Sequence, residues 1–341
     1  MEEKINIIMI GIGHHHADGI MQELLRHPRF HVLGYYEPNE IVLAEKINAD
    51  FYKGLKRYEG RADVAADKKV QALFVEAPAE YQVDYAMSFI DLRLPMHLDK
   101  PVGIDFDKTK SLFSIMKKND IPFQVGYMYR YNPAVLEMKK MYENGDLGEI
   151  YNVEAVMNTD NNKSFREWLS TYSGGSMFIL GCHMIDIVYS IMGYPSSIIS
   201  YVKKTGRDSA DSCDLCSAVW EYPKGIAFIQ ATCIEAGGYG RRRIIVSGSK
   251  GSIEIQPMEN PTKMYFSKTD PSKAYTSDDK KQIDLSKYPT VSRYTYMLDN
   301  FAAIANNDDT SLYFTPDYDY EITLQELIIK SLDKNNMYVR R

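Results

Sequence analysis

The first 37 residues follow an order that strongly constrains the fold: a strand, a glycine turn, a helix and a second strand. Residues 4–10 are a continuous apolar run of strand length, and residues 31–37 read as another strand. Between them, Ile20, Leu24 and His27 fall on one face of a helix. Strand–helix–strand units of this kind build parallel sheets. Further alternating segments continue the pattern to residue 122: VQALFVEA, EYQVDYAMSFIDLR, PMHLD and DFDKTKSLFSIMKKND.

The remainder of the chain has a different rhythm, because strand-like segments follow one another directly and a YPKG turn joins two of them. Adjacent strands of this kind predict an antiparallel sheet. We therefore predict an α/β fold in two domains, with a parallel sheet in 1–122 and an α/β domain with an open, mostly antiparallel sheet in 123–341. The expected strands are IYNVEAVMN, SIISYVKK, DLCSAVWEY, GIAFIQATC, RRIIVSG and GSIEIQP; helices are expected near 175–192, 291–306 and 317–331, and a polar loop over 268–290.

Gly11 and Gly13 stand between the first strand and the helix, which is the context of a dinucleotide-binding fingerprint. The first glycine allows the tight turn, and the second lets the backbone approach a pyrophosphate at the helix N-terminus. His16 occupies the position of the usual third glycine. Glu37 ends the second strand, where a carboxylate can bind the ribose hydroxyls and repels a 2′-phosphate. The cofactor expected is therefore NAD, with NADP disfavoured.

Three consecutive histidines, His14, His15 and His16, offer the alternative of a metal site. Adjacent residues on a tight loop point in divergent directions, so we expect that these three do not face one ion and that the protein has no metal. For His15, a position on the polar rim of the loop with no ligand role remains open.

Composition excludes several other classes of function. The net charge is −6, and the compact basic cluster Arg241–Arg243 is too short for a nucleic-acid surface, so no nucleic-acid partner is expected. No segment approaches about 18 uninterrupted apolar residues and the N-terminus lacks a signal-peptide pattern, so we expect a cytoplasmic protein without a membrane partner. The Cys-x-x-Cys pair lacks a second pair to complete a zinc site, so the cysteines are expected to be structural thiols: Cys182, Cys213, Cys216 and Cys233.

Lys100 follows the last strand of the first half in HLDKPVG, and Pro101 fixes the backbone beside it. Ligands of open parallel sheets bind at the carboxyl ends of the strands. A lysine there is a candidate proton donor or hydrogen-bonding electrophile. The alternative is a surface lysine in a turn.

The segments GIGHHH, YYEPN, LDKPVG, VGYMYRYNP and GGSMFILGCHMID occur in the order and approximate spacing of one family. Over nearly its whole length the chain resembles the Gfo/Idh/MocA family (glucose–fructose oxidoreductase and inositol dehydrogenase). The resemblance implies a Rossmann domain followed by an α/β domain whose open sheet commonly joins protomers, here into a homodimer or homotetramer. It also implies NAD(P)-dependent oxidation or reduction of a secondary hydroxyl on a small carbohydrate or cyclitol.

The resemblance also assigns site residues. Lys100 matches the active-site lysine of the family, and His183 of GCHMID matches the histidine that acts as acid/base or binds the reacting hydroxyl. The cofactor-binding positions it implies are Gly11, Gly13, His14, His16, Glu37, Ala77, Pro78, Asp99, Lys100, Pro101 and Met128. The implied substrate-binding positions are Arg130, Asn132, Trp168, Ile179, His183 and Tyr239.

The chain departs from the family pattern at several positions. Ile179 replaces an aspartate four residues before His183, so His183 and Lys100 must suffice or Asp186 substitutes. The other departures are Ala79 and Gln82 for Asn and His, and Asp99 for Glu. Two further functions therefore stay open: a glycosidase that uses bound NAD in a transient oxidation, and a non-catalytic sensor of a dinucleotide or sugar.

Overall fold

The computed structural model of the chain describes residues 4–259, 261–273, 280–308, 314–333 and 337–339. These residues pack into two compact units. The first contains residues 1–131 and 291–325, and the second contains residues 132–290 and 326–341. The sequence prediction placed the domain boundary at residue 122 and made each domain continuous. In the structure the chain instead returns to the first unit near its C-terminal end.

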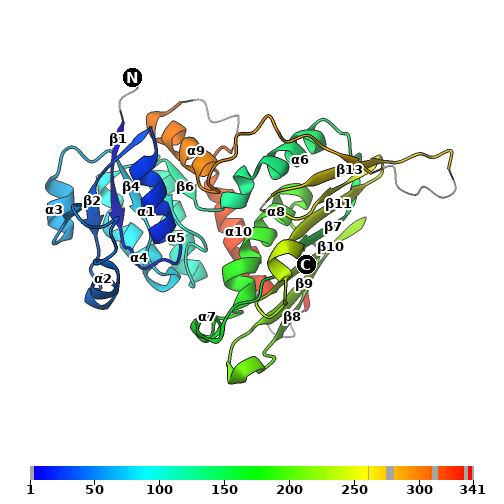
Figure 1. The fold of residues 1–341 in the computed structure, drawn as a ribbon, viewed down its shortest axis with the longest axis horizontal. Helices are drawn as coiled ribbons and strands as arrows, with labels where there is room; N and C mark the ends of the chain where they lie inside the picture. The colour runs from blue at the N-terminus through cyan, green and yellow to red at the C-terminus, as the bar shows by residue number, and fades with distance from the viewer. Residues whose placement is uncertain (1–3, 260, 274–279, 309–313, 334–336, 340–341) are drawn as a thin grey trace. The chain divides into compact units, whose positions relative to one another are not determined.

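The first unit contains a six-stranded parallel sheet in the order β3-β2-β1-β4-β5-β6 (Figure 1). This is the strand order of a Rossmann fold, which confirms the predicted parallel sheet. Two strands were not predicted, β3 and β6, because they have only two and three residues. The strands are β1 (Ile5–Ile10), β2 (Phe30–Tyr36), β3 (Lys56–Arg57), β4 (Ala72–Val75), β5 (Met96–Leu98) and β6 (Phe123–Val125).

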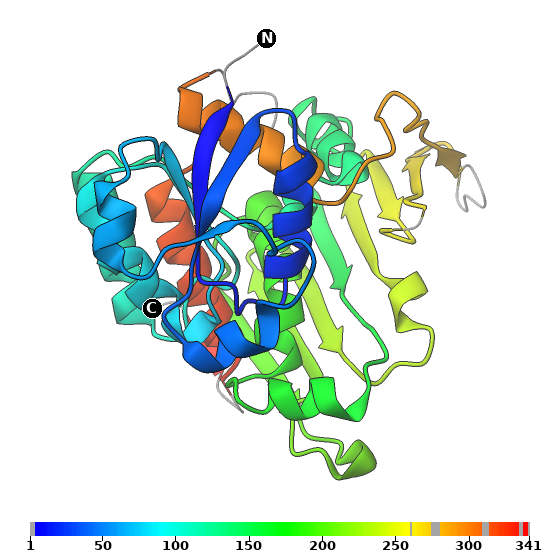
Figure 2. The ribbon, with the colours of Figure 1, turned by 60° about the vertical axis from the view of Figure 1, so that its left-hand side comes forward.

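Helices flank this sheet, and their sequences show why they form. In α5, Asp105 caps the N-terminus by accepting a hydrogen bond from the backbone of Lys108, and buried residues recur at helical spacing from Thr109 to Met116. Figure 2 shows the helices around the strands of this unit. They are α1 (Ala17–Arg26), α2 (Glu40–Lys46), α3 (Arg61–Ala66), α4 (Ala79–Ser88), α5 (Phe106–Lys118), α9 (Thr295–Asn306), the short turns η1 (Ile90–Leu92) and η2 (Met128–Tyr131), and the first part of α10 (Tyr318–Ser331).

The second unit contains a nine-stranded sheet in the order β14-β13-β12-β11-β7-β10-β9-β8-β15. Among the described strands of this second sheet, only β7 and β10 pair in parallel. The sheet is therefore mostly antiparallel, as predicted. The six expected strands are present, and the YPKG turn joins β9 to β10. The bounds are β7 (Ile150–Val156), β8 (Ser197–Lys203), β9 (Leu215–Tyr222), β10 (Gly225–Thr232), β11 (Arg243–Gly248), β12 (Gly251–Ile255), β13 (Met264–Lys268), β14 (Lys281–Gln282) and β15 (Met337–Val339).

The two faces of this sheet differ. Ile244, Ala155, Ile229 and Ala218 are paired across four strands and all are buried, on the face against which α8 packs. The helical segments of this unit are α6 (Pro133–Glu143), α7 (Lys163–Leu169), the π-turn η3 (Met177–Gly181), α8 (Cys182–Met192), the short turns η4 (Arg207–Ser209) and η5 (Gly238–Arg241), and the end of α10.

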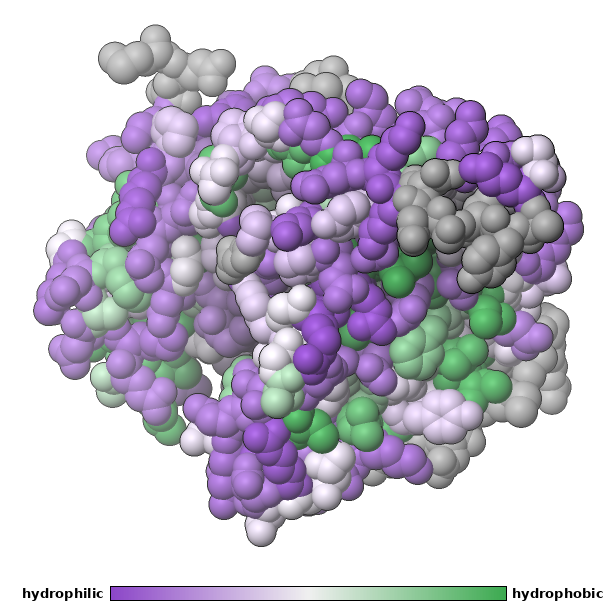
Figure 3. Space-filling view, turned by 45° about the vertical axis from the view of Figure 1, so that its right-hand side comes forward, coloured by the Kyte–Doolittle hydropathy of each residue, from purple (hydrophilic) through white to green (hydrophobic). Residues whose placement is uncertain are grey.

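The opposite face of the sheet carries half-exposed apolar side chains. One cross-strand row contains four partly buried apolar residues, with Glu154 of β7 between the first two: Ile245, Phe228, Val219 and Ile199. Ile226 on the same face is 51% exposed. Hydrophobic residues gather in groups on the surface in the space-filling view (Figure 3).

Two further expectations concern membranes and cysteines. Within the described residues, no helix has the length and apolar character needed to cross a bilayer. The four cysteines are buried thiols that form no disulfide, in agreement with the predicted structural thiols. Burial raises the pKa of the Cys216 thiol to about 11, so it is not a reactive thiolate.

Candidate functional site

The turn after β1 requires both of its glycines. Gly11 has a φ of +78°, and a Cβ there would lie 3.0 Å from the backbone of Ala77. A Cβ on Gly13 would lie 3.0 Å from the ring of Pro78. The backbone N–H of Gly11 donates to the carbonyl of Tyr36 (2.7 Å), and α1 begins four residues after Gly13. The turn therefore has the tight geometry and the following helix N-terminus that a dinucleotide pyrophosphate needs.

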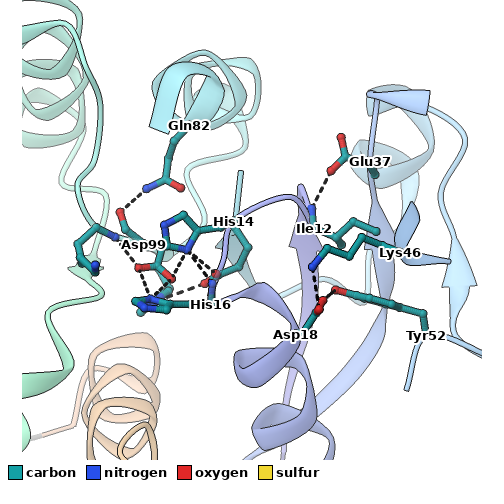
Figure 4. Close-up of polar contacts among 12 residues, drawn as sticks. Ile12, His14, His16, Asp18, Glu37, Lys46, Tyr52, Gln82 and Asp99 are labelled. Carbon is teal, nitrogen blue, oxygen red and sulfur yellow. Dashed lines mark hydrogen bonds and ion pairs between the residues drawn. The ribbon is translucent and has the colours of Figure 1, made fainter. Parts of the chain in front are cut away.

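Glu37 is tied to this turn. Its Oε2 accepts a hydrogen bond from the backbone of Ile12 (2.7 Å; Figure 4). Its Oε1 accepts from the backbone of Asn39 (2.9 Å) and the hydroxyl of Tyr85 (3.2 Å). The carboxylate thus fixes the loop in addition to placing a negative charge at the end of β2, and its ribose-binding role stays a prediction.

Lys100 lies at the carboxyl end of β5 and is 1% exposed, so it is not a surface lysine in a turn. Its backbone N–H donates to Oδ1 of Asp99 (2.6 Å). Gln82, one of the departures from the family pattern, donates to the backbone carbonyl of Asp99. The following loop is held by α10, because Nε2 of Gln325 donates to the carbonyl of Gly103 (2.7 Å). Several contacts therefore fix the backbone around the lysine.

The histidine run is arranged differently from our expectation. Each of His14, His15 and His16 has one ring nitrogen within 4.8 Å of a ring nitrogen of the other two. The expectation that the three side chains point in divergent directions is therefore wrong. Nδ1 of His14 lies 2.9 Å from Oδ2 of Asp99, and Nδ1 of His16 lies 3.1 Å from both Asp99 oxygens (Figure 4). Although burial opposes ionisation, these histidines hold the pKa of Asp99 well below its usual range.

Arg130 is buried in an ion pair and among aromatic rings. Its Nη1 donates to Oε1 of Glu321 (2.7 Å), and its guanidinium carbon lies 4.6 and 4.2 Å from the ring centroids of Tyr127 and Phe314. It is 8% exposed. Arg130 is therefore held inside the first unit, where Met128 is also buried (2% exposed). The predicted substrate-binding role of Arg130 and the predicted cofactor-binding role of Met128 stay predictions.

Asn132 makes hydrogen bonds at both ends of its side-chain amide. Its Oδ1 accepts from the backbone of Ala134 (2.9 Å), and its Nδ2 donates to the carbonyl of Met258 (3.1 Å). Both ends of the amide are thus engaged in capping α6 and holding a loop, and the substrate-binding role of Asn132 stays a prediction. The Asn–Pro pair at 132–133 was the available signal, since Asn is favoured at the N-cap and Pro at the first helical position.

The other predicted substrate residues lie in the second unit. His183 and Asp186 share the first turn of α8 and are 4% and 1% exposed. Ile179 lies in the π-turn before α8 and is 1% exposed. The ring of Trp168, which is half-buried, meets the buried ring of Tyr172 edge to face, with 5.2 Å between the ring centroids.

Tyr239 lies in the turn after β10. The guanidinium carbon of Arg242 lies 4.5 Å from the centroid of its ring. Its substrate-binding role, and those of His183, Trp168 and Ile179, stay predictions.

The sequence matches two family descriptions that together span most of the chain. Residues 5–127 match the oxidoreductase family with an NAD-binding Rossmann fold, and residues 135–254 match the GFO/IDH/MocA C-terminal domain. The chain belongs to the GFO/IDH/MocA family of oxidoreductases. The predicted family is thereby confirmed.

Individual GFO/IDH/MocA relatives are distant in sequence. An inositol 2-dehydrogenase of Corynebacterium glutamicum is 24% identical over 151 residues, which cover 44% of each chain and so less than half of that relative. The scyllo-inositol 2-dehydrogenase (NADP(+)) of Bacillus subtilis is 20% identical. The matched region covers 65% of this chain and 62% of that relative. Among solved structures, the aldose–aldose oxidoreductase of Caulobacter crescentus has a TM-score of 0.79 at 16% identity, covering 99% of this chain and 100% of that one. The structural likeness shows that the fold is shared.

Proposed function

We propose that this protein is an NAD(H)-dependent oxidoreductase that acts on a secondary hydroxyl, or the corresponding ketone, of a sugar, cyclitol or sugar derivative. The observation that carries the proposal is the buried Lys100, which lies on the same carboxyl edge of the parallel sheet as the glycine turn. Ligands of such sheets bind at this edge. The two inositol dehydrogenase relatives support the substrate class.

The glycine turn suits the cofactor, because its two glycines let the backbone pack tightly against Ala77 and Pro78 directly before the N-terminus of α1, where a pyrophosphate binds. Bound NAD⁺ supplies the hydride acceptor. In the proposed reaction, His183 accepts the hydroxyl proton while Lys100 hydrogen-bonds the same oxygen and stabilises the negative charge that develops on it. The reverse direction uses the same two groups.

We infer a preference for NAD over NADP from Glu37. Its carboxylate ends β2, where the adenosine ribose of a Rossmann dinucleotide lies. A 2′-phosphate would meet a second negative charge there. One relative is NADP-linked, so the ratio of activities with the two cofactors tests this inference directly.

Absorbance at 340 nm tests the activity, with NAD⁺ or NADP⁺ and a panel of cyclitols, hexoses, pentoses and anhydrosugars. We expect NADH production with one substrate class, and loss of at least about 100-fold in turnover for Lys100→Met and His183→Gln. Lys108→Met removes an exposed lysine of the same unit and is the matched control. Near-normal turnover in Lys100→Met would contradict the assignment.

A redox glycosidase is the second candidate, and Ile179 favours it. This position lacks the carboxylate that the dehydrogenase pattern places four residues before the histidine. Such an enzyme would cleave aryl glycosides in the presence of NAD⁺ without accumulating NADH. If neither NADH production nor glycoside cleavage is detected while NADH still binds, a non-catalytic sensor of a dinucleotide or sugar is favoured.

We also propose that the half-exposed face of the nine-stranded sheet binds a second copy of the chain. Extended apolar faces on folded proteins mark association sites. Light scattering after size exclusion should give a dimer or tetramer, and Phe228→Lys should shift it toward monomer. Ile41→Lys, at an exposed apolar position on α2, is the control.

A further inference from the structure

Two carboxylates end neighbouring parallel strands of the first unit. Glu76 follows β4 and Asp99 follows β5, and their exposed fractions are 0% and 1%. Two carboxylates in a dry site repel each other unless a proton or a cation lies between them.

Glu76 lacks the partners that a buried carboxylate needs. Neither of its oxygens receives a hydrogen bond from the described part of the chain. Nδ1 of His14 lies 3.8 Å from Oε2, and Nε2 of His97 lies 3.6 Å from Oε1. Both distances exceed the 2.7–3.2 Å of an N–H···O hydrogen bond. A buried carboxylate without these bonds is expensive, so it points to a missing cation.

The hydrogen bonds of Gln124 reveal which nitrogen of His97 carries the hydrogen. Nε2 of Gln124 donates to the hydroxyl of Tyr131 (2.8 Å) and the carbonyl of Met297 (3.1 Å). Its Oε1 therefore accepts from Nδ1 of His97 (3.1 Å). In the neutral ring, Nε2 then presents a lone pair toward Glu76. Two electron-pair donors face each other, as metal ligands do, and an outer carbonyl that orients the ring is typical of such sites.

We propose that His14, Glu76 and Asp99 bind a divalent first-row transition metal ion. One donor atom from each lies within 4.8 Å of the others, and Nδ1 of His14 lies 2.9 Å from Oδ2 of Asp99. Ligand atoms around a tetrahedral ion, with bonds of about 2.0–2.2 Å, are about 3.3–3.6 Å apart. The distances from Nδ1 of His14 to Asp99 (2.9 Å) and to Glu76 (3.8 Å) differ from this range by only a few tenths of an ångström. Figure 4 shows His14 and His16 on either side of Asp99.

The charges and the donor types specify the ion. Two carboxylates cancel a charge of +2, so the buried site becomes neutral when the histidines are neutral. Nitrogen and oxygen donors without thiolate suit Zn²⁺, Fe²⁺ and Mn²⁺ rather than Cu⁺. Asp99 is held in place by the N–H of Lys100, and His16 stands beside it as a further donor. The proposal revises our expectation of no metal and does not depend on the proposed enzymatic activity.

The test is metal binding to the full chain, stripped with a chelator and checked by mass spectrometry. Zn²⁺ is titrated in competition with a chromophoric chelator, and Co²⁺ is added to record its visible absorption. We expect one ion per chain and a Co²⁺ spectrum with nitrogen and oxygen ligands. Glu76→Gln keeps the shape of the side chain, removes the charge and should lower Zn²⁺ affinity by at least about 100-fold. Glu40→Gln, in an exposed pair with Arg57, is the control.

Thermal unfolding separates loss of the site from loss of the fold. Metal-free Glu76→Gln should be as stable as the wild type or more so, because an unpartnered buried carboxylate is gone. Zn²⁺ should raise the Tm of the wild type and leave that of the variant unchanged. Equal Zn²⁺ affinity in the two proteins would show an ion bound by the histidine run only, and would overturn the proposal. Failure of the folded wild type to bind micromolar Zn²⁺ would also overturn it.

Discussion

Breaking the buried ion pair between Arg130 and Glu321 should strongly destabilise the first unit. The two side chains are 6% and 2% exposed, and their N···O distance is 2.7 Å. Removing one partner of a buried pair leaves an uncompensated charge and costs about 3–5 kcal/mol. We therefore expect Glu321→Ala to lower the free energy of unfolding by about 3–5 kcal/mol, measured by urea denaturation and far-UV circular dichroism. Arg130→Met with Glu321→Leu should recover most of this loss, because neither buried charge remains.

The exposed pair of Lys108 and Asp84 gives the control. These side chains are 55% and 54% exposed, and a pair of this kind contributes about 0–1 kcal/mol. Asp84→Ala should therefore be nearly neutral. If Glu321→Ala cost no more than Asp84→Ala, the reasoning from burial would be refuted, and with it the placement of the first part of α10 in the interior of the first unit.

Two other substitutions test single features of the fold. Gly11→Ala should lower the free energy of unfolding by about 1–2 kcal/mol and weaken NADH binding in a fluorescence titration, because the added Cβ would lie 3.0 Å from Ala77. Gly54 gives the control, since it has a similar φ of +83° but no atom within 4 Å of an added Cβ. Gly54→Ala should therefore leave NADH binding unchanged. In the second unit, a hydrogen bond from Lys287 lowers the pKa of Glu137. The stabilisation from this carboxylate is therefore complete above the ordinary Glu pKa of about 4.3 and is lost as the pH falls through the lower folded value. Glu137→Gln should remove that acid-side decrease from the plot of unfolding free energy against pH, and an unchanged slope would contradict the assignment.

Local patterns in the sequence were sufficient to predict most elements of both sheets. The glycine turn and the strands around it were recognisable because apolar periodicity and turn residues are short-range signals. β6 was missed because three residues, Phe123 to Val125, carry too little periodicity. The placement of α9 in the first unit could not be read from its amphipathic pattern, which shows that a helix has a buried face but not what covers it.

The site was predictable only in part for the same reason. Lys100 and the glycines carry their signal in adjacent residues. The histidine run was visible, but Glu76 lies about 60 residues away in an ordinary strand segment, and only the pairing of β1 with β4 brings it beside His14. The substrate-binding role of Arg130 was predicted from the family resemblance. Its ion pair with Glu321 could not be predicted, because that residue lies 191 positions further along the chain.

The return of the chain to the first unit also sets an order for folding during synthesis. Phe301 of α9 lies 4.9 Å from Phe74 and 5.7 Å from His97, between ring centroids, and covers apolar surface of β4 and β5. A ribosome completes those strands about two hundred residues before it supplies this ring. One face of the nascent parallel sheet therefore stays incompletely covered while residues 132–290 of the second unit are translated. Exposed apolar surface of this kind is where chaperones bind and where aggregation begins, so the first part of this protein to be made is among the last to be finished.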